Sequence, residues 1–202
     1  MKENKDVGAD DDLRFVSLCK KGDIDAFEYL VNKHQKKMLN VAYRMVGSYE
    51  EACEVVQDAF VSAYKNIKDF EGRSGFSTWL CSIVINLSKN RLKQIKSGLI
   101  HERFSMDDPV AAEDGFFRIE PASDAPSVLE QLEKKELQEK VQGCINGLDG
   151  DFRAVLVLRD LQGFSYDEIG SALRINAGTV KSRLSRAREA VRDCLKKALG
   201  RL

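Results

Sequence analysis

The sequence predicts an all-α protein with two small helical domains joined by a long acidic linker. Apolar residues recur every three to four positions through most of the chain, which is the period of an amphipathic helix. The three prolines, the residues that best break helices, all fall between positions 109 and 126. The segment around them, residues 99–136, holds ten acidic residues against four basic ones. Helical segments therefore flank a proline-containing acidic connection.

These composition changes set the expected boundaries. We expect a disordered tail at residues 1–12, a first helical domain at 13–97, an acidic linker at 98–129 and a second helical domain at 130–202. A linker of this length is usually functional or disordered rather than a tight connection. Its Phe116–Phe117 pair has no assigned role.

The first domain shows three helical patterns. Apolar residues at helical spacing run from Asp23 to Val46. Ser48, followed three residues later by Glu51, has the pattern of a capping box and opens a helix that runs to Lys65. A loop with the sequence DFEGRSGF follows, and a third helix is expected from about Ser77.

The second domain contains a helix-turn-helix pattern. Its helices are expected near 128–146, 150–162, 165–173 and 177–199. Ser165 and Glu168 form a second capping-box pattern, and only the short turn RINA separates the last two helices. Two short helices with so tight a turn are typical of a DNA-binding helix-turn-helix.

The last helix divides into two faces at 100° per residue. Its apolar positions cluster on one side and are expected to face the core: Val180, Leu184, Ala187 and Val191. The opposite side carries Ser182, Ser185, Arg186 and Glu189, with Lys181, Arg183 and Arg188 on the flanks. Such a face suits a recognition helix, although a solvated basic face on a packing helix is the alternative. The capping box, the tight turn and the absence of acidic residues from 171–188 favour DNA.

Two faces of the first domain also point outward. The helix from Ser48 turns Glu54, Gln57, Asp58 and Val61 away from its apolar stripe. Such a face indicates either a protein partner or an ordinary solvent-facing surface, and spacing alone favours the latter.

The next helix presents Asn86, Lys89, Asn90 and Lys93 opposite its apolar positions. Aromatic residues near a basic surface can stack on unpaired bases, which makes Phe70, Phe76 and Trp79 candidates. The alternative is that all three are core residues, and for Trp79 the core is favoured.

Composition excludes several classes of protein. Thirty-two basic and 32 acidic residues give a net charge of zero, so bulk charge does not define the partner. No apolar run approaches the roughly 20 residues of a membrane span, and the first residues lack the apolar core of a signal peptide. The five cysteines are odd in number and never in CxxC spacing, so neither a disulfide framework nor a cysteine-based zinc site is expected. We expect Cys53 and Cys81 to be buried thiols, and the protein to be soluble and cytoplasmic.

Catalytic patterns are also missing from the sequence. His34 and His101 stand apart without companion ligands, and there is neither a GxxxxGK[ST] phosphate loop nor a GxSxG elbow. We therefore expect no enzyme activity, no catalytic residue, no metal and no cofactor.

Two long segments resemble one bacterial family. Residues 50–93 closely resemble region 2 of an extracytoplasmic-function (ECF) RNA polymerase sigma factor, and residues 148–192 resemble region 4 of the same family. The two occur in the family's order with an intervening linker. The resemblance implies a promoter-specificity subunit that binds core RNA polymerase and recognises −10 and −35 promoter elements.

The resemblance also implies roles for the faces described above. Glu54, Gln57, Asp58 and Val61 would dock on the clamp coiled coil of the largest polymerase subunit, and region 4 would meet the flap of the second-largest subunit. An anti-sigma factor would be a further partner. The −10 element would meet Phe70, Gly72, Arg73, Ser74, Phe76, Asn86, Lys89, Asn90 and Lys93. The −35 element would meet Thr179, Lys181, Ser182, Arg183, Ser185, Arg186 and Arg188.

A second functional class is an autonomous helix-turn-helix transcriptional regulator. In that case the first domain would be a ligand-binding or dimerisation module. Such a regulator would bind its operator tightly alone, whereas a sigma subunit would bind promoter DNA weakly until polymerase fixes the spacing of its domains.

Overall fold

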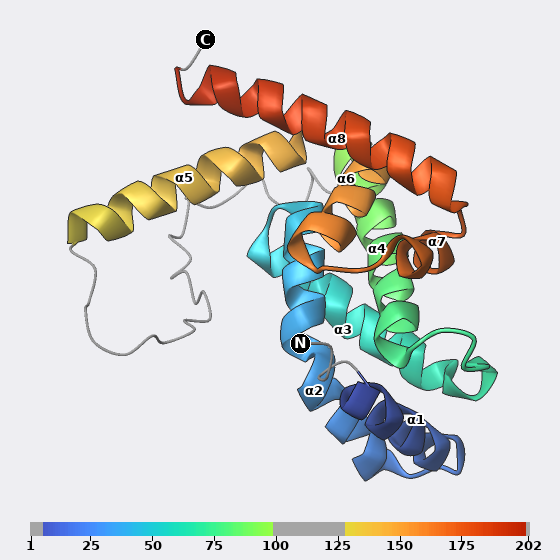
Figure 1. Cartoon of the computed structure of the whole chain (residues 1–202). Helices are drawn as coiled ribbons and strands as arrows, with labels where there is room; N and C mark the ends of the chain where they lie inside the picture. The colour runs from blue at the N-terminus through green and yellow to red at the C-terminus, as the bar shows by residue number, and fades with distance from the viewer. Residues whose placement is uncertain (1–5, 99–127, 201–202) are drawn as a thin grey trace.

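The computed structural model describes residues 6–98 and 128–200, and within these ranges the chain forms helices and turns but no strand (Figure 1). The predicted all-α fold is confirmed. Among the described helices, none combines the length and apolar content needed to cross a membrane. The acidic linker, apart from its two ends, lies outside the described residues, as does the Phe116–Phe117 pair.

The first half is a bundle in which α2, α3 and α4 pack on one another and α1 lies along α2. Asp23 accepts a hydrogen bond from the amide of Ala26 at 3.0 Å and so caps α2. Gly47 ends that helix with φ of 85°, a left-handed conformation that glycine adopts without steric cost. The elements are α1 (Asp6–Lys20), α2 (Ile24–Val46), α3 (Tyr49–Lys65), the 3₁₀ turn η1 (Ile67–Asp69) and α4 (Phe76–Lys96).

Helix α1 corrects the predicted disordered tail. The helix begins at Asp6, so residues 6–12 are helical, while residues 1–5 lie outside the described residues. Asp12 is buried, and its carboxylate lies 2.9 Å from Nε2 of His34 and 2.8 Å from Nζ of Lys33. Burial alone would raise the pKa of Asp12, but the contacts with His34 and Lys33 outweigh it and lower that pKa. The prediction failed because a run of acidic residues concealed a helix held by polar contacts.

The second half contains the predicted helix-turn-helix. Ser165 accepts from the amide of Glu168 at 3.2 Å, and the Glu168 carboxylate accepts from the amide of Ser165 at 2.6 Å, so this capping box is complete. The elements are α5 (Val128–Asn146), α6 (Gly150–Leu156), the π-helical turn η2 (Val157–Leu161), α7 (Tyr166–Leu173) and α8 (Ala177–Ala198).

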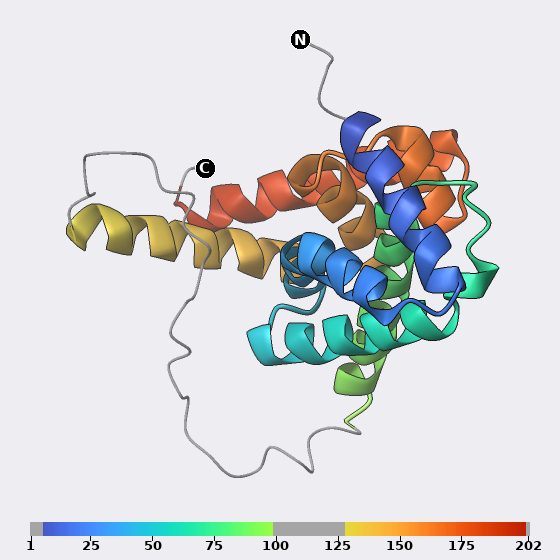
Figure 2. The ribbon, with the colours of Figure 1, turned by 90° about the horizontal axis from the view of Figure 1, so that it is seen from below.

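The two halves pack directly against each other rather than standing apart. Helix α7 lies against α4, and α2 contacts both α5 and α6 (Figure 1, Figure 2). Buried apolar residues of both halves belong to one continuous cluster, which includes Leu80 and Val84 of α4 with Ile169 of α7 and Leu184 of α8. The sequence identified two helical units but gave no sign that they share a core.

The cysteines differ from expectation in two respects. Cys144 of α5 and Cys194 of α8 form a disulfide across a sequence separation of 50 residues. Spacing rules missed the pair because only the packing of α5 on α8 brings these distant positions together. Cys81 is buried as expected, and burial raises the pKa of its thiol to about 12. Cys53 is exposed, so the expectation of a buried thiol there was wrong.

We predict that Cys144→Ser lowers the free energy of unfolding of the oxidised protein. In the chain-entropy description, a disulfide that closes a loop across 50 residues lowers the entropy of the unfolded chain and so adds about 4 kcal/mol to the free energy of unfolding. Denaturant unfolding followed by circular dichroism measures the change. Cys53→Ser is the matched control, because that thiol is exposed and unpaired. Equal unfolding curves for the parent and Cys144→Ser would contradict the prediction.

Candidate polymerase and nucleic-acid interfaces

Helix α3 exposes the face predicted to meet a protein partner. The side chains of Glu54, Gln57, Asp58 and Val61 are all exposed, and Val61 retains 47% of its accessible surface. The opposite side of α3 is buried against α2 and α4. The structure thus presents an acidic surface with one exposed valine, and its role in binding a partner remains a prediction.

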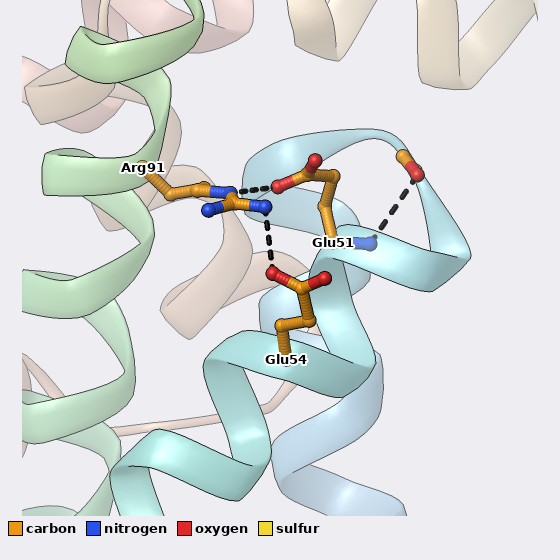
Figure 3. Close-up of polar contacts among 4 residues, drawn as sticks. Glu51, Glu54 and Arg91 are labelled. Carbon is orange, nitrogen blue, oxygen red and sulfur yellow. Dashed lines mark hydrogen bonds and ion pairs between the residues drawn. The ribbon is translucent and has the colours of Figure 1, made fainter. Parts of the chain in front are cut away.

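Arg91 of α4 braces this acidic face (Figure 3). Its Nε donates to the carboxylate of Glu51, and its NH2 donates to Oε2 of Glu54 at 2.6 Å. The hydrogen bond to Glu51 is the main reason that the pKa of Arg91 is raised. Glu51 lies in the first turn of α3, where the N-cap Ser48 accepts a hydrogen bond from the Glu51 amide at 3.4 Å. One guanidinium therefore ties α4 to the start of α3 and orients Glu54.

Sequence reasoning missed this brace. Arg91 lies on the opposite helix, 37 residues after Glu54, and no local spacing links them. The only signal in the sequence is that Arg91 stands in a basic, acid-free segment, 84–97, while the first six residues of α3 include Glu50, Glu51 and Glu54.

The loop between η1 and α4 stands on a cluster of aromatic side chains. Phe70 and Phe76 are 4% and 1% exposed, and their ring centroids lie 5.1 and 5.7 Å from that of Trp79. Phe70 and Phe76 were predicted to contact the −10 element, but their rings are in the core and are unavailable to a strand in this conformation. The core alternative holds for both, and they support the loop that carries Arg73, whose side chain is 86% exposed.

The remaining predicted −10 residues divide by environment. Asn86, Asn90 and Lys93 are exposed on α4 and Gly72 is exposed in the loop, whereas Ser74 is partly buried. Lys89 is the exception on α4. Its ammonium donates to Oδ1 of Asp151 in α6 at 2.5 Å.

A polar cleft of about 610 Å³ lies between the loop before α4 and the end of α7. One side is lined by the loop and by α4 residues that include Trp79 and Asn86. The other side is the end of α7, from Ser171 to Arg174. The predicted −10 surface therefore faces another part of the same chain.

The two faces of α8 follow the helical period. Val180, Leu184 and Ala187 are buried, which confirms the predicted core face, and Val191 is partly buried. The opposite face is exposed at Lys181, Ser182, Ser185 and Arg186.

Two of the cations on the flanks of α8 are paired with acidic residues. Arg183 lies 2.9 Å from Oδ2 of Asp151, and Arg188 lies 2.6 Å from Oδ1 of Asp160. Thr179 is at the start of the helix, where its amide donates to the Asn176 cap at 2.7 Å.

Comparison with known proteins identifies the family. The sigma-70 region 2 family matches residues 30–97, and the sigma-70 region 4 family matches residues 138–191. The chain is 37% identical over 190 residues to the RNA polymerase sigma-H factor of Pseudomonas aeruginosa, covering 93% of this chain and 95% of that protein. The chain belongs to the ECF RNA polymerase sigma factors. It is also 36% identical to SigW of Bacillus subtilis, over 90% of this chain and 95% of that one. The sigma-E factor of Escherichia coli is 38% identical, over 89% and 92%.

Solved structures show the same fold. CnrH in complex with the cytosolic domain of CnrY superposes with a TM-score of 0.66 and 22% identity, over 93% of this chain and 98% of that one. RpoE of Bartonella quintana, in complex with the anti-sigma factor NepR, gives a TM-score of 0.61 and 22% identity, over 86% and 98%.

The family matches assign each exposed surface of this sigma factor to region 2 or to region 4. The α3 face, the loop before α4 and the polar face of α4 all lie within the region 2 match, and α8 lies within the region 4 match up to residue 191. Asp151, which joins Lys89 to Arg183, also lies within region 4. The occurrence of both regions in one chain favours a sigma subunit over an autonomous regulator.

We predict that Arg91→Ala destabilises region 2 more than removal of an exposed arginine does. Glu51 is only 12% exposed and would lose its charged partner, which costs about 1–3 kcal/mol for a buried group. Arg73→Ala is the control, because Arg73 and its partner Glu71 are 86% and 62% exposed and such a pair contributes little. Thermal unfolding compares the two variants. Equal loss of stability would show that Arg91 does not brace the helices.

Proposed function

We propose that this sigma factor binds core RNA polymerase through the α3 face and reads promoters through two separate surfaces. The −10 surface is the loop with the polar face of α4, and the −35 surface is the exposed face of α8. We propose further that it acts in the cytoplasm and carries out no catalysis of its own. The observation that carries the proposal is that one chain presents two basic polar surfaces beside an acidic face braced by Arg91.

The α3 face has the properties of a protein-docking surface. Charged carboxylates surround an exposed valine, and complementary charge across an interface speeds association and fixes orientation. The expected contact is the clamp coiled coil of the largest polymerase subunit, and region 4 would meet the flap of the second-largest. Because Arg91 holds Glu54 at 2.6 Å, this part of the face is already ordered before docking.

The −10 surface suits a melted strand. Extruding a base costs a few kcal/mol, which the protein must offset with contacts to the base and the backbone. The loop packs on the buried rings of Phe70 and Phe76 and on the partly buried Trp79, which support its backbone and leave Arg73 exposed to a strand. The amides of Asn86 and Asn90 and the cations of Lys89 and Lys93 supply hydrogen bonds and phosphate contacts.

The −35 surface suits duplex DNA. The exposed face of α8 offers Lys181, Ser182, Ser185 and Arg186, and an arginine can form two hydrogen bonds to a guanine edge in the major groove. Thr179, Arg183 and Arg188 flank this face and lie where phosphates would run.

An anti-sigma factor is a further proposed partner. CnrH and RpoE of Bartonella quintana were solved with CnrY and with the anti-sigma factor NepR, and both share the fold of this chain. The exposed α3 and α4 faces are the surfaces such a partner would cover.

Run-off transcription tests the proposal against the autonomous regulator. Bacterial core polymerase is assayed with and without the protein on a pooled promoter library. Transcripts that appear only with the protein, and that share upstream −10 and −35 elements, are expected. Tight binding of duplex DNA by the protein alone, without added transcription, would support the regulator instead.

We predict that Asp58→Ala weakens binding to core polymerase by about tenfold, or about 1.4 kcal/mol, while the fold is retained. Asp58 is exposed on α3, so its removal affects a partner rather than the core. Fluorescence anisotropy of labelled sigma factor measures the affinity. Asp25→Ala is the control, since Asp25 is exposed on α2 outside the proposed face. If both variants bind equally, the interface lies elsewhere.

We predict that Arg186→Ala lowers discrimination at the −35 element by about 1–3 kcal/mol. Transcription from promoters selected in the run-off assay, with and without a substituted −35 element, measures this difference. Lys197→Ala is the control, because Lys197 is an exposed cation at the far end of the same helix. Unchanged discrimination by Arg186→Ala would remove this residue from the base contacts.

A further inference from the structure

One carboxylate joins the two DNA-binding surfaces of this sigma factor. Asp151 stands in the first turn of α6, where Oδ1 lies 2.5 Å from the ammonium of Lys89 and Oδ2 lies 2.9 Å from NH2 of Arg183. Lys89 belongs to the proposed −10 surface and Arg183 to the flank of the proposed −35 surface. A single acidic residue therefore forms an ion pair with a cation from each region.

The surroundings of Asp151 resemble a phosphate site. Its pKa is lowered, first by the hydrogen bond from Lys89 and then by the charges of Lys89, Arg183 and Lys93. Gly150 lies directly beside the Lys89 stem, because a Cβ at that position would be 3.7 Å from Lys89 Cγ. Three cations proposed to meet DNA phosphates thus face one internal anion.

The same arrangement places region 4 over the −10 loop. The end of α7, from Ser171 to Arg174, lines the cleft of about 610 Å³ opposite the loop and Asn86. Lys37 of α2 lies 4.3 Å from the Phe164 ring centroid, and Gln162 donates to Asn40 at 3.2 Å, so η2 and the start of the helix-turn-helix also contact region 2. A melted strand entering the loop would meet α7.

We propose that Asp151 is an internal phosphate mimic that holds the free protein in a closed, DNA-incompetent state. This inference rests on the proposed function, because it needs α4 and α8 to be the DNA-binding surfaces. In the closed state Asp151 occupies the position of a strand phosphate at Lys89, and region 4 shields the −10 surface. Binding of DNA to Lys89 and retention of Asp151 exclude each other.

Promoter geometry gives a second reason that this state cannot bind both elements. Lys89 and Arg183 share one carboxylate and are therefore a few ångströms apart, whereas duplex DNA rises about 3.4 Å per base pair. Elements named for positions −10 and −35 are more than two helical turns apart at about 10 base pairs per turn. The regions must separate before both elements can be bound.

The contact is suited to release. The side chains of Lys89, Asp151 and Arg183 are 24%, 43% and 28% exposed, so water and salt screen the two ion pairs. Neither of these two ion pairs is deeply buried, so a partner that binds only the open arrangement shifts the population toward it without first desolvating or exposing a buried charge at Asp151. Core polymerase, which we propose binds the α3 face and region 4 at two separate sites, is such a partner.

Zero-length crosslinking tests the contact in the protein without any substitution. A carbodiimide joins a lysine to a carboxylate only when the two touch, and peptide mass spectrometry identifies the pair. We expect a Lys89–Asp151 crosslink in the free protein and its loss when core polymerase is added. Lys140 and Glu136, one helical turn apart at 2.7 Å on α5, form the matched internal control, whose crosslink should persist. Failure to find the Lys89–Asp151 crosslink in free protein, while the control crosslink forms, overturns the proposal.

Asp151→Asn tests the competition with DNA. The probe is a fluorescein-labelled single-stranded DNA 20-mer of mixed sequence, and anisotropy measures its binding to the isolated protein. Releasing Lys89 and the −10 surface should tighten binding about threefold to tenfold, because the competent fraction rises. Asp160→Asn is the matched control. It also frees an α8 arginine and removes one negative charge, but its ion pair stays within region 4.

The outcomes separate this inference from the proposed function. Tighter DNA binding by Asp151→Asn than by Asp160→Asn supports the role of Asp151 as a phosphate mimic, and equal DNA binding by the two variants overturns it. Circular dichroism checks that both variants retain their helices, and the crosslinking result decides the question if Asp151→Asn does not fold. The DNA-binding assay uses the isolated protein, and the crosslinking assay uses the protein alone and with core polymerase. If the protein directs transcription but Asp151 has no inhibitory role, the run-off assay gives specific transcripts, whereas the crosslinking and DNA-binding assays give the results that overturn this inference.

Discussion

The arrangement of the two regions depends on the buried guanidinium of Arg153. This side chain is 3% exposed and donates to the carbonyls of Met45, Asn146 and Leu148, the last at 3.1 Å. Met45 is at the end of α2 and Asn146 at the end of α5, where carbonyls lack partners within their own helices. Burial lowers the pKa of Arg153. One side chain therefore satisfies the ends of a region 2 helix and a region 4 helix together.

This constraint places the functional surfaces. Arg44 donates to Gln142 at 2.8 Å beside the Arg153 contacts, so α5 is fixed to the end of α2. Arg153 lies in α6, two residues after Asp151, and the same short helix thus carries the buried brace and the partly exposed contact with Lys89. Since α6 packs against α8, the position of the recognition helix follows from the same junction. The short helix α6 therefore links the docking of the two regions to the position of α8.

Sequence patterns predicted the features that depend on interactions between residues close together in the chain. The capping box at Ser165 and Glu168 and the buried stripe of α8 follow from residues within one or two turns of each other. Long-range polar contacts left no such pattern. Asp12 with His34, Arg91 with Glu51, and Cys144 with Cys194 each join residues that only tertiary packing brings together. Phe70 and Phe76 illustrate a different difficulty. An aromatic residue at a loop gives the same sequence pattern whether its ring stacks on a base or packs in the core under the loop.

We propose that the free protein holds its two regions closed and that polymerase opens them. Dyes placed at the exposed residues Lys65 of α3 and Lys197 of α8 report the distance between the regions by energy transfer. If the regions separate on binding, transfer is efficient in the free protein and falls clearly as core polymerase is titrated to saturation. Unchanged transfer in a preparation shown to be bound to polymerase would mean that the regions do not separate.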